Sequence, residues 1–161
     1  MDIPQRKRNR LKSYDYSTPG AYFITVCTKE RQNLLWENVG ASNARPPQIV
    51  LSEYGQTVEA VIQRINRYYP SVSVENYTIM PNHIHLLLQV HETNGGRPLV
   101  APTISQIVQQ LKGQISKQLG SSIWQRSFHD HIIRSDADYR MIWEYIDTNP
   151  QKWQEDCFYT E

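Results

Sequence analysis

Two histidines separated by a single residue, His83 and His85, are the side chains of this 161-residue chain best suited to bind a metal. They follow a Pro-Asn pair that interrupts two stretches rich in aliphatic and β-branched residues, a pattern typical of two strands joined by a tight turn. Side chains alternate between the faces of a strand, so the two imidazoles project from one face, with backbones about 6.6 Å apart. Two imidazoles on one exposed face would form half of a divalent-metal site.

The same pair can instead be two unrelated surface or core histidines. Ile84, Leu86 and Leu88 weaken that alternative, because they identify the opposite face of the strand as the buried one. A buried histidine pair would also need polar partners, which the motif itself does not supply. Both interpretations stay open at this point.

A second group of candidate residues lies near the C-terminus, where Tyr145 and Asn149 are four residues apart on one face of a predicted helix. A tyrosine beside an apolar stripe commonly belongs to the core, and an asparagine before a proline commonly ends a helix. If the helix packs on the histidine face, however, Tyr145 becomes a candidate nucleophile, since a metal can stabilise its phenolate. Asn149 would then supply a third metal ligand. This nitrogen and oxygen ligand set suits Mn²⁺ or Mg²⁺, and it does not exclude Zn²⁺.

The predicted elements that position these groups follow the order β-α-β-β-α-β, with a further helix at the end. Apolar periodicity and turn residues predict strands at residues 21–28, 73–80, 82–90 and 123–134, and helices at 51–69, 103–119 and 135–148. The first six elements match the ferredoxin-like α+β arrangement, in which both helices cover one face of an antiparallel sheet. We therefore expect the other face to be free for chemistry, with the additional C-terminal helix bringing Tyr145 to it.

Length and composition are consistent with a single folded domain, which we place at residues 13–161. No apolar run is long enough to span a membrane, and neither cysteine has a CxxC companion, so we expect a cytoplasmic protein. The net charge of +1 is unevenly distributed, because residues 1–12 form a basic, flexible arm. This arm is either a solvated terminus or a phosphate-binding segment. Its cations are Arg6, Lys7, Arg8, Arg10 and Lys12.

Three sequence runs resemble the REP-associated tyrosine transposases, relatives of the single-tyrosine HUH transposases of the IS200/IS605-like group. The runs are P-N-H-I-H-L-L-L around the histidines, W-Q-R-S-F-H-D-H-I-I-R at Trp124–Arg134 and D-Y-R-M-I-W-E-Y-I-D-T-N-P at Asp138–Pro150. The resemblance covers about residues 13–153 and implies a ferredoxin-like fold. It also implies that His83 and His85 bind the metal, that Asn149 completes the metal site and that Tyr145 is the catalytic residue.

The resemblance further implies a metal-dependent enzyme that cleaves and rejoins single-stranded DNA near small palindromic hairpins through a 5′-phosphotyrosine. Its partners would be single-stranded DNA hairpins, bound by a monomer or a homodimer. Rings that stack on bases and cations that contact phosphates are candidate DNA-binding groups. In the second run they are Trp124, Arg126, Phe128, His129, His131 and Arg134, and the cations of the arm add to them. A tryptophan at the start of a strand is at least as often a core residue, so that alternative stays open for Trp124.

Three other functions compete with this interpretation. A non-catalytic, domesticated DNA-hairpin-binding protein shares the fold but needs no metal, and the intact candidate ligands and Tyr145 argue against it. An RNA-binding module of the RRM type would carry an aromatic-rich RNP1 motif, which the sequence lacks. A zinc hydrolase with an H-x-H strand end would use a barrel fold, which needs far more than 161 residues.

Overall fold

The computed structural model describes residues 11, 13–37, 49–92 and 102–160. The cations of the predicted basic arm, Arg6, Lys7, Arg8, Arg10 and Lys12, therefore lie outside the described residues. Four antiparallel strands form a sheet in the order β2-β3-β1-β4. They are β1 (Gly20–Cys27), β2 (Val72–Ile79), β3 (His83–Val90) and β4 (His129–Ile133). This strand order, with the order of elements along the chain, confirms the predicted ferredoxin-like α+β fold.

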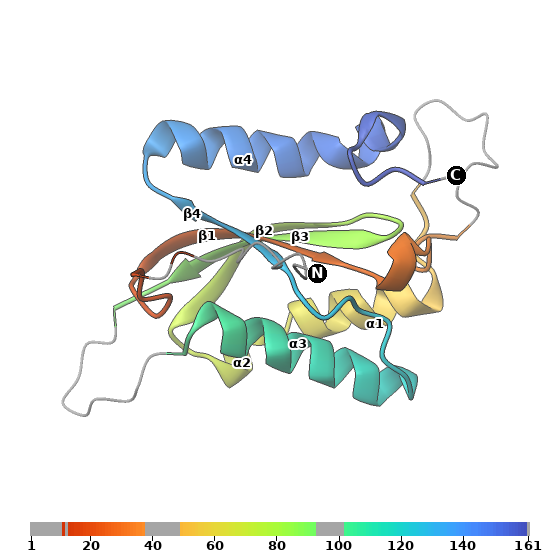
Figure 1. Ribbon diagram of the computed structural model, residues 1–161, viewed down its shortest axis with the longest axis horizontal. Helices are drawn as coiled ribbons and strands as arrows, with labels where there is room; N and C mark the ends of the chain where they lie inside the picture. The colour runs from red at the N-terminus through yellow and green to blue at the C-terminus, as the bar shows by residue number, and fades with distance from the viewer. Residues whose placement is uncertain (1–10, 12, 38–48, 93–101, 161) are drawn as a thin grey trace, which may run out of the picture.

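Helices lie on both sides of the sheet (Figure 1). One side carries α1 (Glu53–Ile62), α2 (Ile65–Tyr68) and α3 (Ile104–Leu119), and the other side carries α4 (Asp136–Thr148). Two 3₁₀ turns, η1 (Lys29–Arg31) and η2 (Asn149–Glu155), follow β1 and α4. In the part of the chain that the structure describes, no helix has the length and apolar character needed to cross a membrane.

The main core lies between the sheet and helices α1 and α3. Alternate residues of the two central strands are buried there, as the period of a strand requires. They are Tyr22, Ile24 and Val26 in β1 and Ile84, Leu86, Leu88 and Val90 in β3. Helix α3 begins with the predicted capping box of Thr103 and Gln106, and the left-handed backbone of Gly120 (φ 75°) ends it. The alternation seen in the sequence is therefore confirmed as a buried sheet face.

Two predicted elements differ from the structure. The predicted helix at 51–69 is divided into α1 and α2, since Arg64 leaves helical geometry with φ −102° and ψ 1°. The predicted strand at 123–134 is reduced to β4, because a lysine satisfies the carbonyl groups of the segment before it. Lys112 of α3 donates hydrogen bonds to the carbonyl oxygens of Gln125 (2.8 Å) and Ser127 (3.2 Å). That segment therefore leaves the sheet and keeps a single bridge to it, between Trp124 and Thr28.

The second face of the sheet, which the two helices of the main core leave open, is covered by α4, the packing that the role considered for Tyr145 requires. Leu87 of β3 packs against Ile142 and Ile146 of α4 in a second, smaller core. Ser135 caps this helix by accepting a hydrogen bond from the amide of Asp138 (3.1 Å).

Helix α4 ends at Thr148, as the sequence predicts, but the chain does not turn away there. Asn149 keeps helical dihedral angles (φ −57°, ψ −45°) although Pro150 follows it, and the chain continues into η2. The buried ring of Trp153 then anchors η2 against the rest of the fold. As a result, the residues after η2 return to the histidine face of the sheet.

Candidate active site

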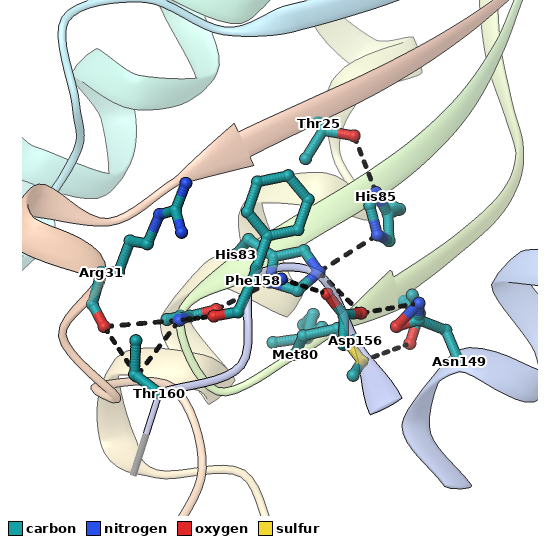
Figure 2. A network of polar contacts seen from close by, with 12 residues as sticks. Thr25, Arg31, Met80, His83, His85, Asn149, Asp156, Phe158 and Thr160 are labelled. Atoms are coloured by element: carbon teal, nitrogen blue, oxygen red, sulfur yellow. Dashed lines mark hydrogen bonds and ion pairs between the residues drawn. The ribbon is translucent and has the colours of Figure 1, made fainter. Parts of the chain in front are cut away.

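His83 and His85 begin strand β3, and their Nε2 atoms are 3.1 Å apart on the face that α4 covers. Their exposed fractions are 0% and 1%, so the expectation that they lie on an exposed face is wrong. The reason is that the chain after η2 covers them. The ring of Phe158 lies 4.6 Å from the ring of His83 (Figure 2).

Two neighbouring side chains supply the polar partners that the H-x-H motif lacks. Asn82 donates from Nδ2 to the carbonyl oxygen of Phe158 (2.7 Å), so its Oδ1 is the atom that accepts from Nδ1 of His83 (2.8 Å). His83 is therefore protonated on Nδ1, and the lone pair of its Nε2 points toward His85. The other imidazole meets the hydroxyl of Thr25 at 2.8 Å through its own Nδ1. When that Nδ1 donates, both Nε2 lone pairs face a common point.

Asp156, which the sequence did not identify, completes this cluster. Its Oδ2 lies 3.7 Å from Nε2 of His83, and the ligand atoms of His83, His85 and Asp156 all lie within 4.8 Å of one another. Asn149, the predicted third ligand, is close by and donates from Nδ2 to the same Oδ2 of Asp156 at 3.0 Å. No short-range pattern connects residue 156 with the histidines, since only the return of the chain after η2 brings it to them.

Burial keeps both histidines in the neutral form that binds metals. It lowers the pKa of His83 to about 2, with smaller contributions from the neighbouring His85 and from the charge of Arg31. Burial alone lowers the pKa of His85 to about 3. The pKa of Asp156 is raised, chiefly by burial, while the amide of Phe158 partly opposes that shift.

The donor atoms of this cluster fit a divalent cation. Two imidazole nitrogens and one carboxylate converge, and Oδ1 of Asn149 is buried with no hydrogen-bond partner among the described residues. A buried acceptor without a donor is costly unless a cation or water satisfies it. Nitrogen and oxygen ligands together suit Mn²⁺ or Mg²⁺.

Tyr145 of α4 lies where the sequence placed it, beside the histidine pair. Its ring is 5.3 Å from the ring of His85 and 6.1 Å from that of Phe23. The residue is 40% exposed, so a ligand from solvent can reach it. Burial raises the pKa of the Tyr145 hydroxyl, a hydrogen bond to Asn149 opposes this shift, and the nearby charge of Asp156 adds to it. At neutral pH the side chain is therefore a protonated phenol.

Two of the predicted DNA-stacking rings belong to the core instead. Trp124 and Phe128 are only 3% and 6% exposed and pack among the residues of the main core. The prediction that these rings stack on DNA bases is wrong, because an enclosed ring offers no face to a base. The turn held by Lys112 folds both rings inward.

The remaining candidates from that run lie at the surface. The exposed ones are Arg126, His129, His131 and Arg134. The ring of His129 is 6.3 Å from that of Phe158, so it borders the histidine site. Nε2 of His131 lies 2.8 Å from Oδ2 of Asp138, which ties this imidazole to the start of α4.

Known proteins resemble this chain along most of its length. The family model described as Transposase IS200 like matches residues 18–149. An uncharacterised protein of Haemophilus influenzae is 30% identical over 178 aligned residues, which cover 99% of this chain and 96% of the relative. A REP-associated tyrosine transposase of Escherichia coli is 25% identical, with 85% of this chain and 70% of the relative covered.

A solved structure shares the fold. It is that of a REP-associated tyrosine transposase bound to a REP hairpin, and it matches with a TM-score of 0.64. The match has 24% sequence identity and covers 89% of this chain and 73% of the other. At that identity the likeness supports the fold, in agreement with the strand order described above.

Proposed function

The chain belongs to the IS200-like transposase family, and we propose on this basis that it cleaves and rejoins single-stranded DNA through a covalent bond to Tyr145. The observation that carries this proposal is the position of the Tyr145 ring, 5.3 Å from the ring of His85 and accessible from solvent. A phenol in that position can reach a phosphate bound at the histidine pair. Tyr145 is therefore the nucleophile.

The reaction is a displacement at phosphorus. The Tyr145 oxygen forms a bond to the phosphorus atom, and the bond from phosphorus to the 3′ oxygen of the preceding nucleotide breaks. The hydroxyl proton of Tyr145 passes to water, and the departing 3′ oxygen takes up a proton. The 5′-phosphate stays on the tyrosine, so a 3′-hydroxyl can later attack it and restore a phosphodiester without a nucleotide cofactor.

The cluster around the histidines would hold a divalent metal. His83, His85 and Asp156 would bind it, and Oδ1 of Asn149 is placed to contribute. When bound, Mn²⁺ or Mg²⁺ would supply a positive charge that neutralises the phosphate during attack. Thr25 and Asn82 orient the two imidazoles through their Nδ1 atoms.

Single-stranded DNA hairpins are the proposed substrate, as the resemblance implies. A phosphate can enter a narrow site only when the bases on either side of it are unpaired, which a duplex does not allow. DNA must also displace the residues that cover the pair, because the ring of Phe158 lies over His83. Arg126, His129 and Arg134 are exposed and would contact the strand, and of these His129 borders the site, with its ring 6.3 Å from that of Phe158.

The alternative is a DNA-hairpin-binding protein without catalytic activity. The cover that Phe158 forms over His83 favours it, since a phosphate can bind at the histidine pair only after Phe158 has moved. The two proposals separate in one experiment, in which folded hairpin oligonucleotides are incubated with the protein and Mn²⁺. A covalent protein–DNA adduct that is absent from Tyr145→Phe supports the enzyme, whereas binding without an adduct supports the alternative.

A further inference from the structure

The turn after β1 contains two consecutive residues in an unfavourable backbone conformation. β1 ends at Cys27, which pairs with His83 across the sheet, and η1 follows almost at once. Within η1, Glu30 and Arg31 have positive φ angles of 54° and 53°. Residues with a Cβ rarely adopt this left-handed conformation, and where they do the surrounding structure must hold them.

The groups that hold Arg31 belong to the candidate active site. Its carbonyl oxygen accepts hydrogen bonds from Nδ2 of Asn82 (3.3 Å) and from the hydroxyl of Thr160 (3.2 Å). Asn82 is also the residue that orients His83, at 2.8 Å. The strained turn and the histidine are therefore fixed by the same side chain.

This backbone conformation directs the Arg31 side chain toward the site. Its guanidinium carbon lies 5.4 Å from the centre of the Phe158 ring, and that ring is 4.6 Å from the ring of His83. Figure 2 shows Phe158 between the guanidinium and the imidazole. The charge of Arg31 also contributes to the lowered pKa of His83, so its field extends to that imidazole.

Arg31 has no acidic partner in the described part of the chain. The ion pairs there join His83 with Asp156 and His131 with Asp138, and neither involves Arg31. The residue is exposed. A guanidinium presents a planar fork of donors that matches two oxygens of a phosphate, and it also stacks on rings. Once DNA displaces Phe158, this fork faces the histidine site, whose carboxylate, Asp156, is ion-paired with His83 and not with Arg31.

The direction of the reaction decides which phosphate Arg31 can reach. Tyr145 approaches from the His85 end of the pair (5.3 Å), whereas Phe158 and Arg31 lie at the His83 end. In a displacement at phosphorus, the attacking and leaving oxygens are on opposite sides of the phosphorus atom. The nucleotide that departs with the 3′-hydroxyl therefore leaves toward Arg31.

We propose that Arg31 binds the phosphodiester one position 5′ to the cleaved phosphate and so holds the departing strand beside the site for rejoining. This inference rests on the proposed function, because it takes its polarity from attack by Tyr145. Arg31 contributes no ligand to the metal and takes no proton. It anchors the substrate and then the product through a charged, two-point contact.

The test measures DNA binding in EDTA, where no cleavage occurs, with wild-type protein and Arg31→Gln. Each is titrated with a hairpin oligonucleotide and with versions that carry one neutral methylphosphonate, moved along the strand one position at a time. In the wild type, neutralising the contacted phosphate should weaken binding about tenfold, as expected for a charged hydrogen bond. In Arg31→Gln the same methylphosphonate should reduce the affinity by less than about twofold, because the guanidinium that contacts this phosphate is already absent.

Lys29→Gln is the matched control, since it removes an exposed cation from the same turn. It should leave the tenfold effect of the methylphosphonate intact. Arg31→Gln and the methylphosphonate each reduce the affinity for the hairpin by some factor. If the two factors simply multiply at every position of the strand, Arg31 contacts no backbone phosphate and the inference fails. This is the result expected if Arg31 only holds the ring of Phe158 in place.

The position of the coupled phosphate tests the polarity separately. If wild-type protein with Mn²⁺ forms an adduct on Tyr145, the coupled phosphate must lie one position 5′ to the cut, and coupling on the 3′ side would overturn the inference. If no adduct forms, the proposed chemistry fails. The binding data still decide whether Arg31 couples to a phosphate at all.

Discussion

Asn149 donates a hydrogen bond from Nδ2 to Oδ2 of Asp156 over 3.0 Å, and this contact connects the end of α4 to the carboxylate nearest His83. The amide nitrogen is thereby committed to the carboxylate. The amide oxygen is left buried without a donor in the described residues. Asn149 and Asp156 therefore act as a unit on one side of the histidine pair, with Tyr145 one helical turn before Asn149.

This arrangement predicts that Asp156 contributes to metal affinity. Asp156→Asn should weaken Mn²⁺ binding by about 10- to 100-fold, because it replaces a charged ligand with a neutral amide. Isothermal titration calorimetry measures this directly. Asp147→Asn is the control, since that carboxylate is exposed and bonded to Asn76 at 2.9 Å, away from the histidines. Equal affinities of the wild type and Asp156→Asn would remove Asp156 from the site.

Removing either histidine should abolish the same binding event. In His83→Ala or His85→Ala, a converging Nε2 atom is lost and two ligands cannot hold Mn²⁺ firmly. Calorimetry should show no saturable site in either variant. Unchanged binding in both would mean that the metal lies elsewhere.

Because the histidines are buried, we expect the free energy of unfolding of the metal-free protein to decrease as the pH is lowered. Their pKa values are lowered from 6.5 to about 2 and about 3 in the folded chain, so the unfolded chain binds more protons between those values and 6.5. The contribution of the two neutral histidines to the free energy of unfolding is therefore fully present above about pH 6.5 and is lost as the pH falls below that value. Each histidine contributes a slope of up to about 1.4 kcal/mol per pH unit.

Urea unfolding in EDTA between pH 7 and pH 5 measures this slope. His85→Gln should remove the share of one histidine, so its free energy of unfolding should depend less steeply on pH than that of the wild type. Comparison of the two slopes cancels the titration of the groups that His85 does not influence. Parallel curves would show that the His85 imidazole is not buried in the neutral form.

Trp124 and His129 should respond in opposite ways to substitution. Trp124→Ala opens a cavity in the main core and should lower the free energy of unfolding by about 3–5 kcal/mol. His129→Ala changes an exposed ring and should leave stability within about 0.5 kcal/mol while weakening hairpin binding. Chemical unfolding and fluorescence anisotropy measure the two effects. If Trp124→Ala were as stable as the wild type but bound the hairpin more weakly, Trp124 would contact DNA and not belong to the core.

The basic arm stays a prediction from the sequence. Deleting residues 1–12 should flatten the slope of log affinity against log salt by about 2 to 3 if three or four of its cations contact phosphates. The position of the cut should not change, because the folded domain sets it. An unchanged slope would identify the arm as a solvated terminus.

The parts of the fold that local pattern determines could be predicted. The alternation of Ile84, Leu86 and Leu88 defined the buried face of β3, and Thr103 with Gln106 defined the start of α3. The pairing of Tyr145 with Asn149 on α4 followed from helical spacing. Each of these rests on residues a few positions apart, where backbone geometry alone relates the side chains.

The parts that depend on the return of the chain could not be predicted. The burial of His83 depends on Phe158, and the third candidate ligand is the carboxylate of Asp156. Both residues reach the histidines only through η2. Trp124 fits a strand pattern, yet the distant Lys112 binds the carbonyl groups that follow it. Thr25 and Asn82 form the hydrogen bonds that the buried imidazoles require. Thr25 lies on another strand, so the H-x-H motif could not indicate its contact with His85.

The role of Tyr145 as nucleophile is tested by locating a covalent DNA adduct. Wild-type protein is incubated with hairpin oligonucleotides and Mn²⁺, digested and analysed by mass spectrometry, with Tyr145→Phe and Tyr139→Phe in parallel. We expect a 5′-phosphonucleotide on Tyr145 in the wild type and in Tyr139→Phe, and none in Tyr145→Phe, which should still bind the hairpin. An adduct on another tyrosine, or cleavage that persists in Tyr145→Phe, would contradict that role.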